Sequence, residues 1–128
     1  SNECRCRCKT EYNNPPIIVT ENGCCTPAED DPALSEDQLL QDEWRVDYFK
    51  QYLSQAQLAV TEDGVNLQGY FAWTLTDNFE WADGYDSRFG IVRVNFETLE
   101  RKIKSSARLL SDIVRSNRIS PDILATAY

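Results

Sequence analysis

Residues 70–75 read Y-F-A-W-T-L, and five of these six side chains are apolar. Such a near-continuous apolar run is typical of a strand that is covered on both faces, as in a parallel sheet. The run P-I-I-V-T at 16–20 has the same character. Between the two runs, S-E-D-Q at 35–38 is a capping-box pattern and E-D-G at 62–64 is a stop signal, so a long helix is expected there. This order of strand, helix and strand indicates parallel β/α units and the α/β fold class.

The expected first helix runs from Ser35 to about Val60. A further strand is expected over Phe89 to Phe96, where apolar and polar residues alternate, and a last helix over residues 103–116. In the first helix, the side chains expected to form a buried stripe are Val46, Phe49, Leu53, Ala56 and Val60, and Trp44, Tyr48 and Tyr52 widen this stripe. In the last helix, the expected buried stripe is Ile103, Ala107, Leu110 and Val114.

The composition limits the chemistry and the partners of the chain. Its 128 residues are 41% hydrophobic, which suits one globular domain with a core. The formal net charge of −8 would repel nucleic acid and anionic membranes, so we expect neither as a partner. The chain contains no histidine, so acid–base chemistry must rest on carboxylates, tyrosine, lysine or cysteine.

The cysteines do not predict a metal site. Zinc sites prefer about two to four residues between paired cysteines, and single-residue spacing with arginines between them fits that pattern poorly. We therefore expect no metal and no cofactor. The odd number of cysteines leaves the disulfide state and the redox compartment open. The five cysteines are Cys4, Cys6 and Cys8 near the start of the chain and the adjacent pair Cys24 and Cys25.

Carboxylates and tryptophans follow both predicted buried strands. Glu21 ends the first, while Trp73 lies in the second and its loop supplies Asp77, Glu80 and Trp81. The carboxyl ends of parallel strands gather functional groups at one edge of the sheet. Aromatic faces stack on sugar rings and carboxylates accept hydrogen bonds from sugar hydroxyls, so a carbohydrate site is one interpretation. Taken alone, the same residues also fit a solvated strand end, a core tryptophan, a loop anchor and a surface charge.

A resemblance to a known family favours the first interpretation. I-V-T-E-N-G at 18–23 resembles the nucleophile motif of the family 1 glycoside hydrolases, the β-glucosidase family. G-Y-F-A-W-T-L-T-D-N-F-E-W-A-D-G-Y at 69–85, followed by R-F-G-I-V at 88–92, resembles the second signature of that family. The resemblance covers about Asn13 to Asn117. Two shorter matches complete it: Asp42, Arg45, Val46 and Tyr48 on the first helix, and Arg101, Lys104, Ser106 and Ala107 at the start of the last.

The resemblance implies a role for each candidate residue. Glu21 would be the catalytic nucleophile. Trp73 would form the platform beneath the non-reducing sugar, and Glu80 would bind two hydroxyls of that sugar. Trp81 would bind another hydroxyl through its indole N–H, and Phe89 would line the same subsite. A glutamate at position 80 also argues against the 6-phospho-β-glycosidase branch of the family.

The implied function is that of a retaining β-glycosidase. It would hydrolyse O-glycosidic bonds of non-phosphorylated β-glucosides or β-galactosides, small molecules that are its expected partners. The family's acid/base glutamate lies in an N-E-P motif, and no N-E-P occurs in this chain. The alternative is therefore an inactive sugar-binding or pseudoenzyme fragment that lacks the acid/base glutamate. A cysteine-bearing interaction module is a third interpretation and rests on residues 1–8 alone.

Members of the family are (β/α)8 TIM barrels, and this chain resembles about the last two β/α units of such a barrel. We expect residues 15–120 to be the C-terminal part of the barrel, residues 1–14 an atypical lead rich in cysteine and arginine, and residues 121–128 a tail. An incomplete barrel exposes strand edges and apolar faces. We therefore expect the 128-residue chain alone to be inactive, and to fold poorly, self-associate or need the missing N-terminal barrel units.

Overall fold

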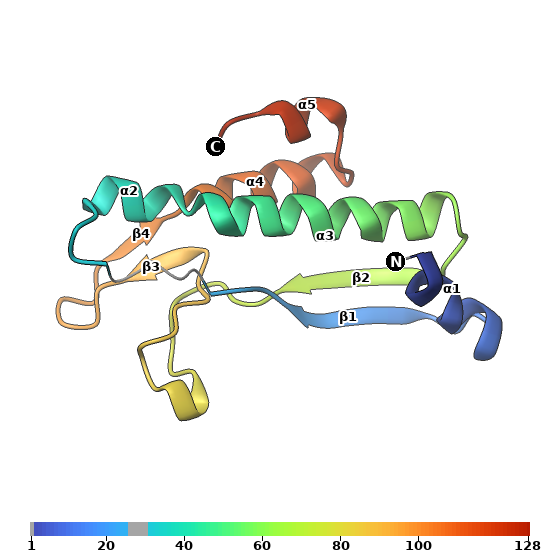
Figure 1. The fold of residues 1–128 in the computed structure, drawn as a ribbon, viewed down its shortest axis with the longest axis horizontal. Helices are drawn as coiled ribbons and strands as arrows, with labels where there is room; N and C mark the ends of the chain where they lie inside the picture. Colours follow the sequence, from blue (N-terminus) through green and yellow to red (C-terminus); the bar gives the residue numbers. More distant parts are fainter. Residues whose placement is uncertain (1, 26–30) are drawn as a thin grey trace.

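The computed structural model describes the backbone of residues 2–25 and 31–128 and the side chains of residues 7–25 and 31–128. A parallel pair of strands, a long helix that connects them and a C-terminal pair of helices make up most of it (Figure 1). In chain order the elements are α1 (Asn2–Glu11), β1 (Ile17–Asn22), α2 (Glu36–Gln41), α3 (Glu43–Thr61), β2 (Leu67–Ala72), the 3-10 helix η1 (Trp81–Asp83), β3 (Val92–Val94), β4 (Arg101–Ile103), α4 (Ser105–Ser116) and α5 (Pro121–Ala125).

The predicted parallel β/α unit is confirmed. Strands β1 and β2 pair in parallel, with Val19 opposite Tyr70 and Asn22 opposite Ala72. Two parallel strands need a crossover connection, and α3 provides it. Figure 1 shows α3 running alongside the strand pair, with α4 next to it and α5 further from the strands. Strand β2 covers Leu67–Ala72, three residues earlier than the expected strand at 70–75.

The strand pair is covered on one face only, so the prediction that both faces are buried was wrong for the described part of the chain. Ile18 is 55% exposed in β1, and Phe71 is 61% exposed in β2. Their neighbours Val19 and Ala72 are half-buried, as expected for side chains that alternate between two faces. Among residues 2–25 and 31–128, nothing covers the second face, and this explains the exposure of its apolar side chains.

The helix expected from Ser35 to about Val60 is two helices. Its start is as predicted, since the Gln38 N–H donates to Ser35 Oγ and the Ser35 N–H donates to Gln38 Oε1. The helix is interrupted at Asp42, which has a left-handed backbone with φ of 31°. The Asp42 carboxylate accepts hydrogen bonds from the backbone and hydroxyl of Ser106 on α4, and these tertiary bonds accompany the break. The end of α3 at Thr61 agrees with the predicted stop.

The hydrophobic core lies between α3 and α4. Its fully packed members are Val46, Phe49 and Leu109, the last of which was not in the predicted stripe. The prediction was wrong for Trp44, Tyr52 and Val60, which are exposed on α3, and for Ile103 and Val114 near and on α4. The partly buried side chains packed against the core are Tyr48, Leu53, Ala72, Ile91, Leu110, Ile113, Ile123 and Tyr128.

The most buried face of α4 is serine-rich and lies beside the predicted stripe, of which Leu110 packs partly against the core. Ser105, Ser106 and Leu109 are its buried residues. The hydrogen bonds from Ser106 to Asp42 orient the helix, and that orientation turns Val114 to solvent with 76% of its surface exposed. Helix α4 begins two residues later than expected, because Ile103 belongs to strand β4.

The strand expected over Phe89 to Phe96 is shorter and has a partner that the pattern did not indicate. Strand β3 contains only Val92–Val94 and pairs antiparallel with β4. The turn between them forms at Asn95, whose side-chain oxygen accepts the N–H groups of Glu97 and Thr98. Thr76 makes an isolated parallel bridge to Val92, so this hairpin continues the order of the sheet beyond β2.

The two ends of the chain are more regular than expected. Residues 2–11 form α1 despite their lack of apolar periodicity. The expected tail contains α5, and Lys50 on α3 donates to the carbonyls of Leu124 in α5 and of Thr126 just after it. In the described part of the chain, no helix has the length and apolar character to cross a membrane.

Candidate functional site

Glu21 lies one residue before the C-terminal end of β1, with an exposed side chain. Trp73 follows β2 directly, and its N–H donates to the carbonyl of Asn22 at 2.8 Å. That bond joins the two strand ends, so the segments that carry Glu21 and Trp73 lie side by side, as the parallel arrangement predicts. No side chain among the described residues hydrogen-bonds to the Glu21 carboxylate or pairs with it.

Gly23 makes the close approach of these segments possible. A Cβ atom at Gly23 would lie 1.7 Å from the carbonyl oxygen of Trp73, far inside van der Waals contact. Only glycine allows two backbones to come this close. The glycine of T-E-N-G is therefore required by the contact between the β1 and β2 ends. The peptide bond that follows Trp73 is cis.

Trp73 and Glu80 form the one direct side-chain contact among the five predicted site residues within the described part of the chain. The indole Nε1–H of Trp73 donates to Glu80 Oε2 at 3.3 Å, and both residues are half-buried. The Glu80 N–H donates to the carbonyl of Gly84 at 2.6 Å, which closes the loop on which Glu80 lies. The bond from Trp73 uses one of about four acceptor positions on the carboxylate, and the others remain for a ligand.

The other two predicted residues border this pair. Trp81 follows Glu80, begins η1 and is 80% exposed. Phe89 is half-buried, and its carbonyl accepts the N–H of Thr74 at 3.2 Å, next to Trp73. The structure thus joins Trp73 to Glu80 by a side-chain hydrogen bond and brings the segments of Glu21 and Phe89 next to Trp73 through backbone hydrogen bonds. Trp81 is connected to this group only as the chain neighbour of Glu80.

The sequence grouped Asp77 with the carboxylates that follow the predicted strands, but the structure shows that it is a buried structural group and does not face a ligand. It is 4% exposed, and all its acceptor contacts are internal. Its Oδ1 accepts the Gly90 N–H at 2.9 Å and lies 3.4 Å from Lys104 Nζ. Its Oδ2 accepts from the Val94 N–H at 3.1 Å and from Arg88 Nη1 at 3.3 Å. Asp77 therefore anchors the segment of residues 88–94, which includes Phe89.

A second buried network explains the motif residues on the two helices. Arg45 is fully buried, and its Nη1 lies 2.6 Å from Asp42 Oδ2. Its Nε donates to the carbonyl of Cys24 at 3.1 Å, and its Nη2 donates to the carbonyl of Arg88 at 2.7 Å. One guanidinium thus connects the loop after Glu21 with the loop before Phe89. The sequence showed that Asp42 and Arg45 match the family, but their spacing could not reveal that Arg45 donates to two backbone carbonyls far away in the chain.

A group of tyrosines lies beneath Asn22. The Tyr70 hydroxyl donates to Asn22 Oδ1 at 2.5 Å. Burial raises the pKa of Tyr70 well above its ordinary value, and the nearby Tyr48, Cys24 and Tyr52 raise it further. Burial and Tyr52 also raise the pKa of Tyr48, while a hydrogen bond with the Asn22 side chain acts in the opposite direction. Tyr48 and Tyr52 stack with ring centroids 4.3 Å apart.

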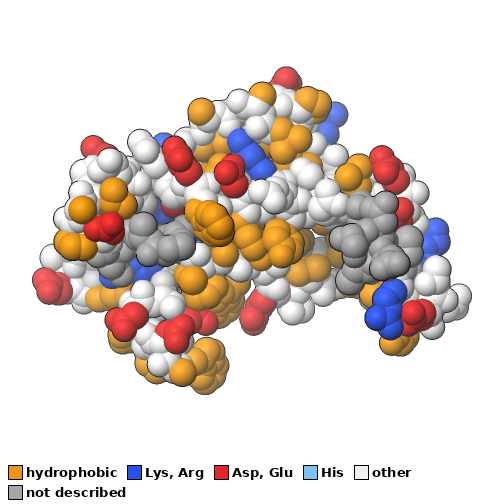
Figure 2. Space-filling view, viewed as in Figure 1, with side chains coloured by type: hydrophobic (Ala, Val, Ile, Leu, Met, Phe, Trp, Pro, Cys, Tyr) orange, Lys and Arg blue, Asp and Glu red, His pale blue; other side chains and the backbone are white. Residues whose placement is uncertain are grey.

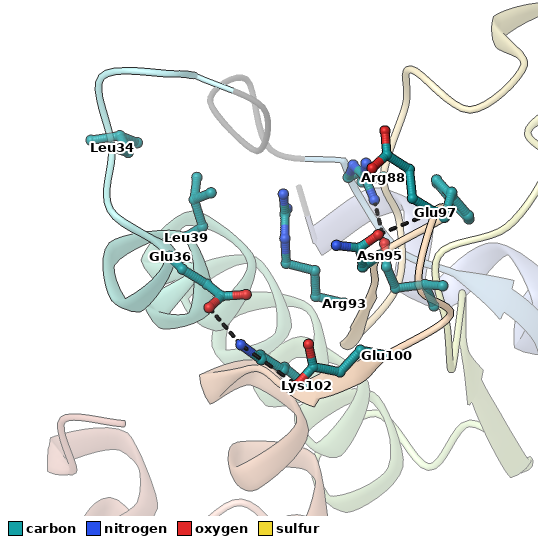
Figure 3. Close-up of a pocket in the computed structure, with 11 residues that line it drawn as sticks. Leu34, Glu36, Leu39, Arg88, Arg93, Asn95, Glu97, Glu100 and Lys102 are labelled. Atoms are coloured by element: carbon teal, nitrogen blue, oxygen red, sulfur yellow. Dashed lines mark hydrogen bonds and ion pairs between the residues drawn. The ribbon is translucent and has the colours of Figure 1, made fainter.

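A hollow of about 590 Å³ lies elsewhere, between α2 and the β3–β4 hairpin (Figure 3). None of the five predicted site residues lines it. Charged side chains from opposite walls pair across it, with Lys102 Nζ 2.5 Å from Glu36 Oε2. That hydrogen bond raises the pKa of Lys102. Its lining residues are Leu34, Glu36, Leu39, Arg88, Arg93, Val94, Asn95, Phe96, Glu97, Glu100 and Lys102.

The cysteines give no metal site in the described residues, where no group of three or more metal-binding side chains occurs. Cys8 and Cys25 are free thiols. The side chains of Cys4 and Cys6 lie outside the described residues, so the predictions for them stay predictions.

Comparison with known proteins identifies the family. The model of glycosyl hydrolase family 1 matches residues 5–119, and the chain belongs to this family. It is 46% identical over 107 residues to β-glucosidase A of Acetivibrio thermocellus, covering 84% of this chain and 23% of that protein. It is 54% identical over 98 residues to β-glucosidase 42 of Arabidopsis thaliana, covering 76% of this chain and 19% of that protein.

Solved structures agree with the sequence comparison. The chain superposes on β-glucosidase 2 from Trichoderma reesei, solved in complex with Tris, with a TM-score of 0.82 at 41% identity, covering 92% of this chain and 25% of that one. For the family 1 β-glucosidase from Thermotoga maritima the TM-score is 0.80 at 42% identity, with 92% and 26% covered. These relatives are TIM barrels, and the chain spans about a quarter of their length.

Proposed function

We propose that this chain is the C-terminal part of a retaining β-glycosidase and supplies its nucleophile, Glu21, and most of its site for the non-reducing sugar. The observation that carries the proposal is the position of Glu21 at the carboxyl end of β1, beside the segment that holds the bonded pair Trp73 and Glu80. In TIM-barrel enzymes the catalytic residues lie at this end of the strands. Membership of glycosyl hydrolase family 1 supports the same reading.

In the proposed mechanism, the ionised Glu21 carboxylate attacks the anomeric carbon of the bound sugar. The bond between that carbon and the leaving oxygen breaks, and a second carboxyl group about 5–5.5 Å away protonates the oxygen. The resulting glycosyl ester on Glu21 is then hydrolysed by water, from which the second group removes a proton. The second group is expected from the part of the barrel that precedes this chain, because the chain has no N-E-P motif.

The sugar would rest against Trp73 and bind through Glu80. The hydrogen bond from the indole N–H fixes the Glu80 carboxylate relative to the ring plane of Trp73. A carboxylate in a fixed orientation binds two adjacent hydroxyls well, because its remaining oxygen positions are preorganised. The exposed indole of Trp81 would donate to a further hydroxyl, and Phe89 would line the apolar side of the subsite. The proposed substrates are non-phosphorylated β-glucosides or β-galactosides.

The rest of the barrel would cover the exposed face of the strand pair. Ile18 and Phe71 are 55% and 61% exposed there, and Leu75 in the loop after β2 is 67% exposed. Figure 2 shows apolar side chains gathered in the centre of the visible side, between α3 and the strand pair, and on the loop that carries η1. Large exposed apolar patches indicate surfaces that another part of a protein covers. The 128-residue chain by itself is therefore proposed to be inactive and to need the preceding barrel units.

A chimeric enzyme tests the proposal. The part of Thermotoga maritima β-glucosidase A that precedes its matched region is joined to residues 12–128 of this chain, which is 47% identical to that enzyme over 109 residues. We refer to this protein as the barrel chimera. It is expected to hydrolyse an aryl β-glucoside, and a 2-deoxy-2-fluoro-β-glucoside is expected to label Glu21, as peptide mapping by mass spectrometry would show.

Variants of the barrel chimera separate the roles. Glu21→Gln is expected to abolish hydrolysis while glucose still binds, because the Trp73 and Glu80 contacts remain. Glu80→Gln is expected to weaken glucose binding, whereas Glu97→Gln, an exposed glutamate in the hollow of Figure 3, should change neither property. Labelling of a carboxylate other than Glu21 would contradict the assignment. Glucose binding without hydrolysis in the unsubstituted chimera would favour the sugar-binding alternative.

A further inference from the structure

The position of the Glu21 carboxylate is set by its backbone in the described part of the chain. No described side chain bonds to that carboxylate, so nothing on it fixes its direction. A nucleophile that is misplaced by about 1 Å can lose on the order of 100-fold in rate. Within this part of the protein, the position of the Glu21 carboxylate therefore depends on the contacts that hold the backbone on either side of Glu21.

Asn22, the next residue, is held at two points. Its carbonyl accepts the N–H of Trp73 at 2.8 Å, which ties it to the end of β2. Its side-chain Oδ1 accepts the hydroxyl of Tyr70 at 2.5 Å. A residue bonded to the β2 segment by both main chain and side chain has little freedom to rotate.

The directions of these hydrogen bonds agree with the chemistry of the groups. An amide has one oxygen that accepts and one nitrogen that donates, and a phenol hydroxyl can do both. Tyr70 donates to the amide oxygen of Asn22, and its raised pKa keeps the hydroxyl protonated and able to donate. Tyr70 therefore holds the Asn22 amide by its oxygen.

We propose that Tyr70 is a positioning residue for Glu21 and acts by holding the Asn22 side chain. This inference rests on the proposed role of Glu21 as nucleophile. Tyr70 does not need to touch the sugar: it fixes the residue next to the nucleophile, and the rigid strand end transmits that position to the carboxylate. The function of T-E-N-G then includes its asparagine, whose side chain ties β1 to β2.

The test uses the barrel chimera with Tyr70→Phe, which removes the hydroxyl and keeps the ring. The first-order rate constant for labelling of Glu21 by the fluoroglucoside reports attack on the anomeric carbon. It is expected to fall about 10- to 100-fold, as for misplacement by a fraction of an ångström. The inhibition constant of glucose should stay within about twofold, because Trp73 and Glu80 keep their geometry.

Tyr128→Phe is the matched control. It removes a tyrosine hydroxyl that bonds to Asp112 Oδ2 at 3.0 Å, far along the chain from the strand ends. Its labelling rate is expected to equal that of the unsubstituted chimera. An unchanged rate in Tyr70→Phe, an equal fall in Tyr128→Phe, or a fall accompanied by weaker glucose binding and a lower melting temperature would each overturn the positioning role. Failure of the unsubstituted chimera to label Glu21 would instead overturn the proposed function.

Discussion

Replacement of Arg45 by methionine should destabilise the barrel chimera strongly. The guanidinium is fully buried, and its contacts include Asp42 Oδ2 at 2.6 Å, the Cys24 carbonyl at 3.1 Å and the Arg88 carbonyl at 2.7 Å. Methionine fills most of the same space but cannot donate a hydrogen bond. The substitution therefore leaves a buried carboxylate without its cation and two carbonyls without this donor.

The magnitude follows from these contacts. Removal of one partner of a buried ion pair costs about 3–5 kcal/mol of the free energy of unfolding. Each carbonyl left without a donor would add about 1–3 kcal/mol if water could not reach it. Ser106 still donates two hydrogen bonds to Asp42, at 2.9 and 2.6 Å, which moderates the loss. We expect a net cost of about 4 kcal/mol, a large part of the stability of a typical domain.

Urea denaturation followed by tryptophan fluorescence measures this cost. Asp42→Asn combined with Arg45→Met removes the unpaired charge and should recover about 1–3 kcal/mol of the loss. Lys102→Met is the control, because Lys102 pairs with Glu36 at the surface and its removal should leave the unfolding midpoint unchanged. A midpoint for Arg45→Met that equals that of Lys102→Met would refute the argument from burial.

Three further outcomes are expected. Gly23→Ala should abolish hydrolysis by the barrel chimera, because the added Cβ would lie 1.7 Å from the Trp73 carbonyl oxygen. Gly69→Ala is the control and should retain activity, since its Cβ would have its nearest contact at 3.6 Å. Equal activities of the two variants would contradict this argument. The stability of the barrel chimera should fall as pH rises above the ordinary tyrosine pKa of 10.0, because the folded state holds the Tyr70 proton more tightly than the unfolded chain does. In urea denaturation, Tyr70→Phe should make this fall of the unfolding midpoint with pH shallower. Residues 1–128 alone should self-associate in sedimentation velocity through their exposed apolar face, and a monomer with a sharp cooperative melt would show otherwise.

The parallel β/α unit could be predicted because its signals are local. Apolar runs mark β1 and β2, the Ser35 capping box marks the start of α2, and the stop signal after Thr61 marks the end of α3. The break at Asp42 could not be predicted, because its cause lies on α4, more than sixty residues later. The same contact turns Leu109, rather than the apolar stripe seen in the sequence, toward the core.

The residues of the candidate site could be proposed from the sequence, but the buried contacts that hold them in place could not. Glu21, Trp73 and Glu80 were recognisable as a carboxylate and aromatic set at strand ends. Asp77 has the same residue type and the same loop, and only its burial beneath residues 88–94 reveals a structural role. Tyr70 read as one more apolar residue of a strand, because no local pattern shows that its hydroxyl reaches Asn22.

The carbonyl acceptors of Arg45 have a consequence for evolution. The guanidinium bonds to the main chain at Cys24, and every amino acid supplies the same oxygen there. Mutations at position 24 can therefore accumulate without loss of this hydrogen bond, whereas no other amino acid can replace Arg45 in the same role. The loop after Glu21 is free to diverge in sequence and to acquire unusual residues such as the adjacent pair Cys24 and Cys25, while its starting point stays fixed in space.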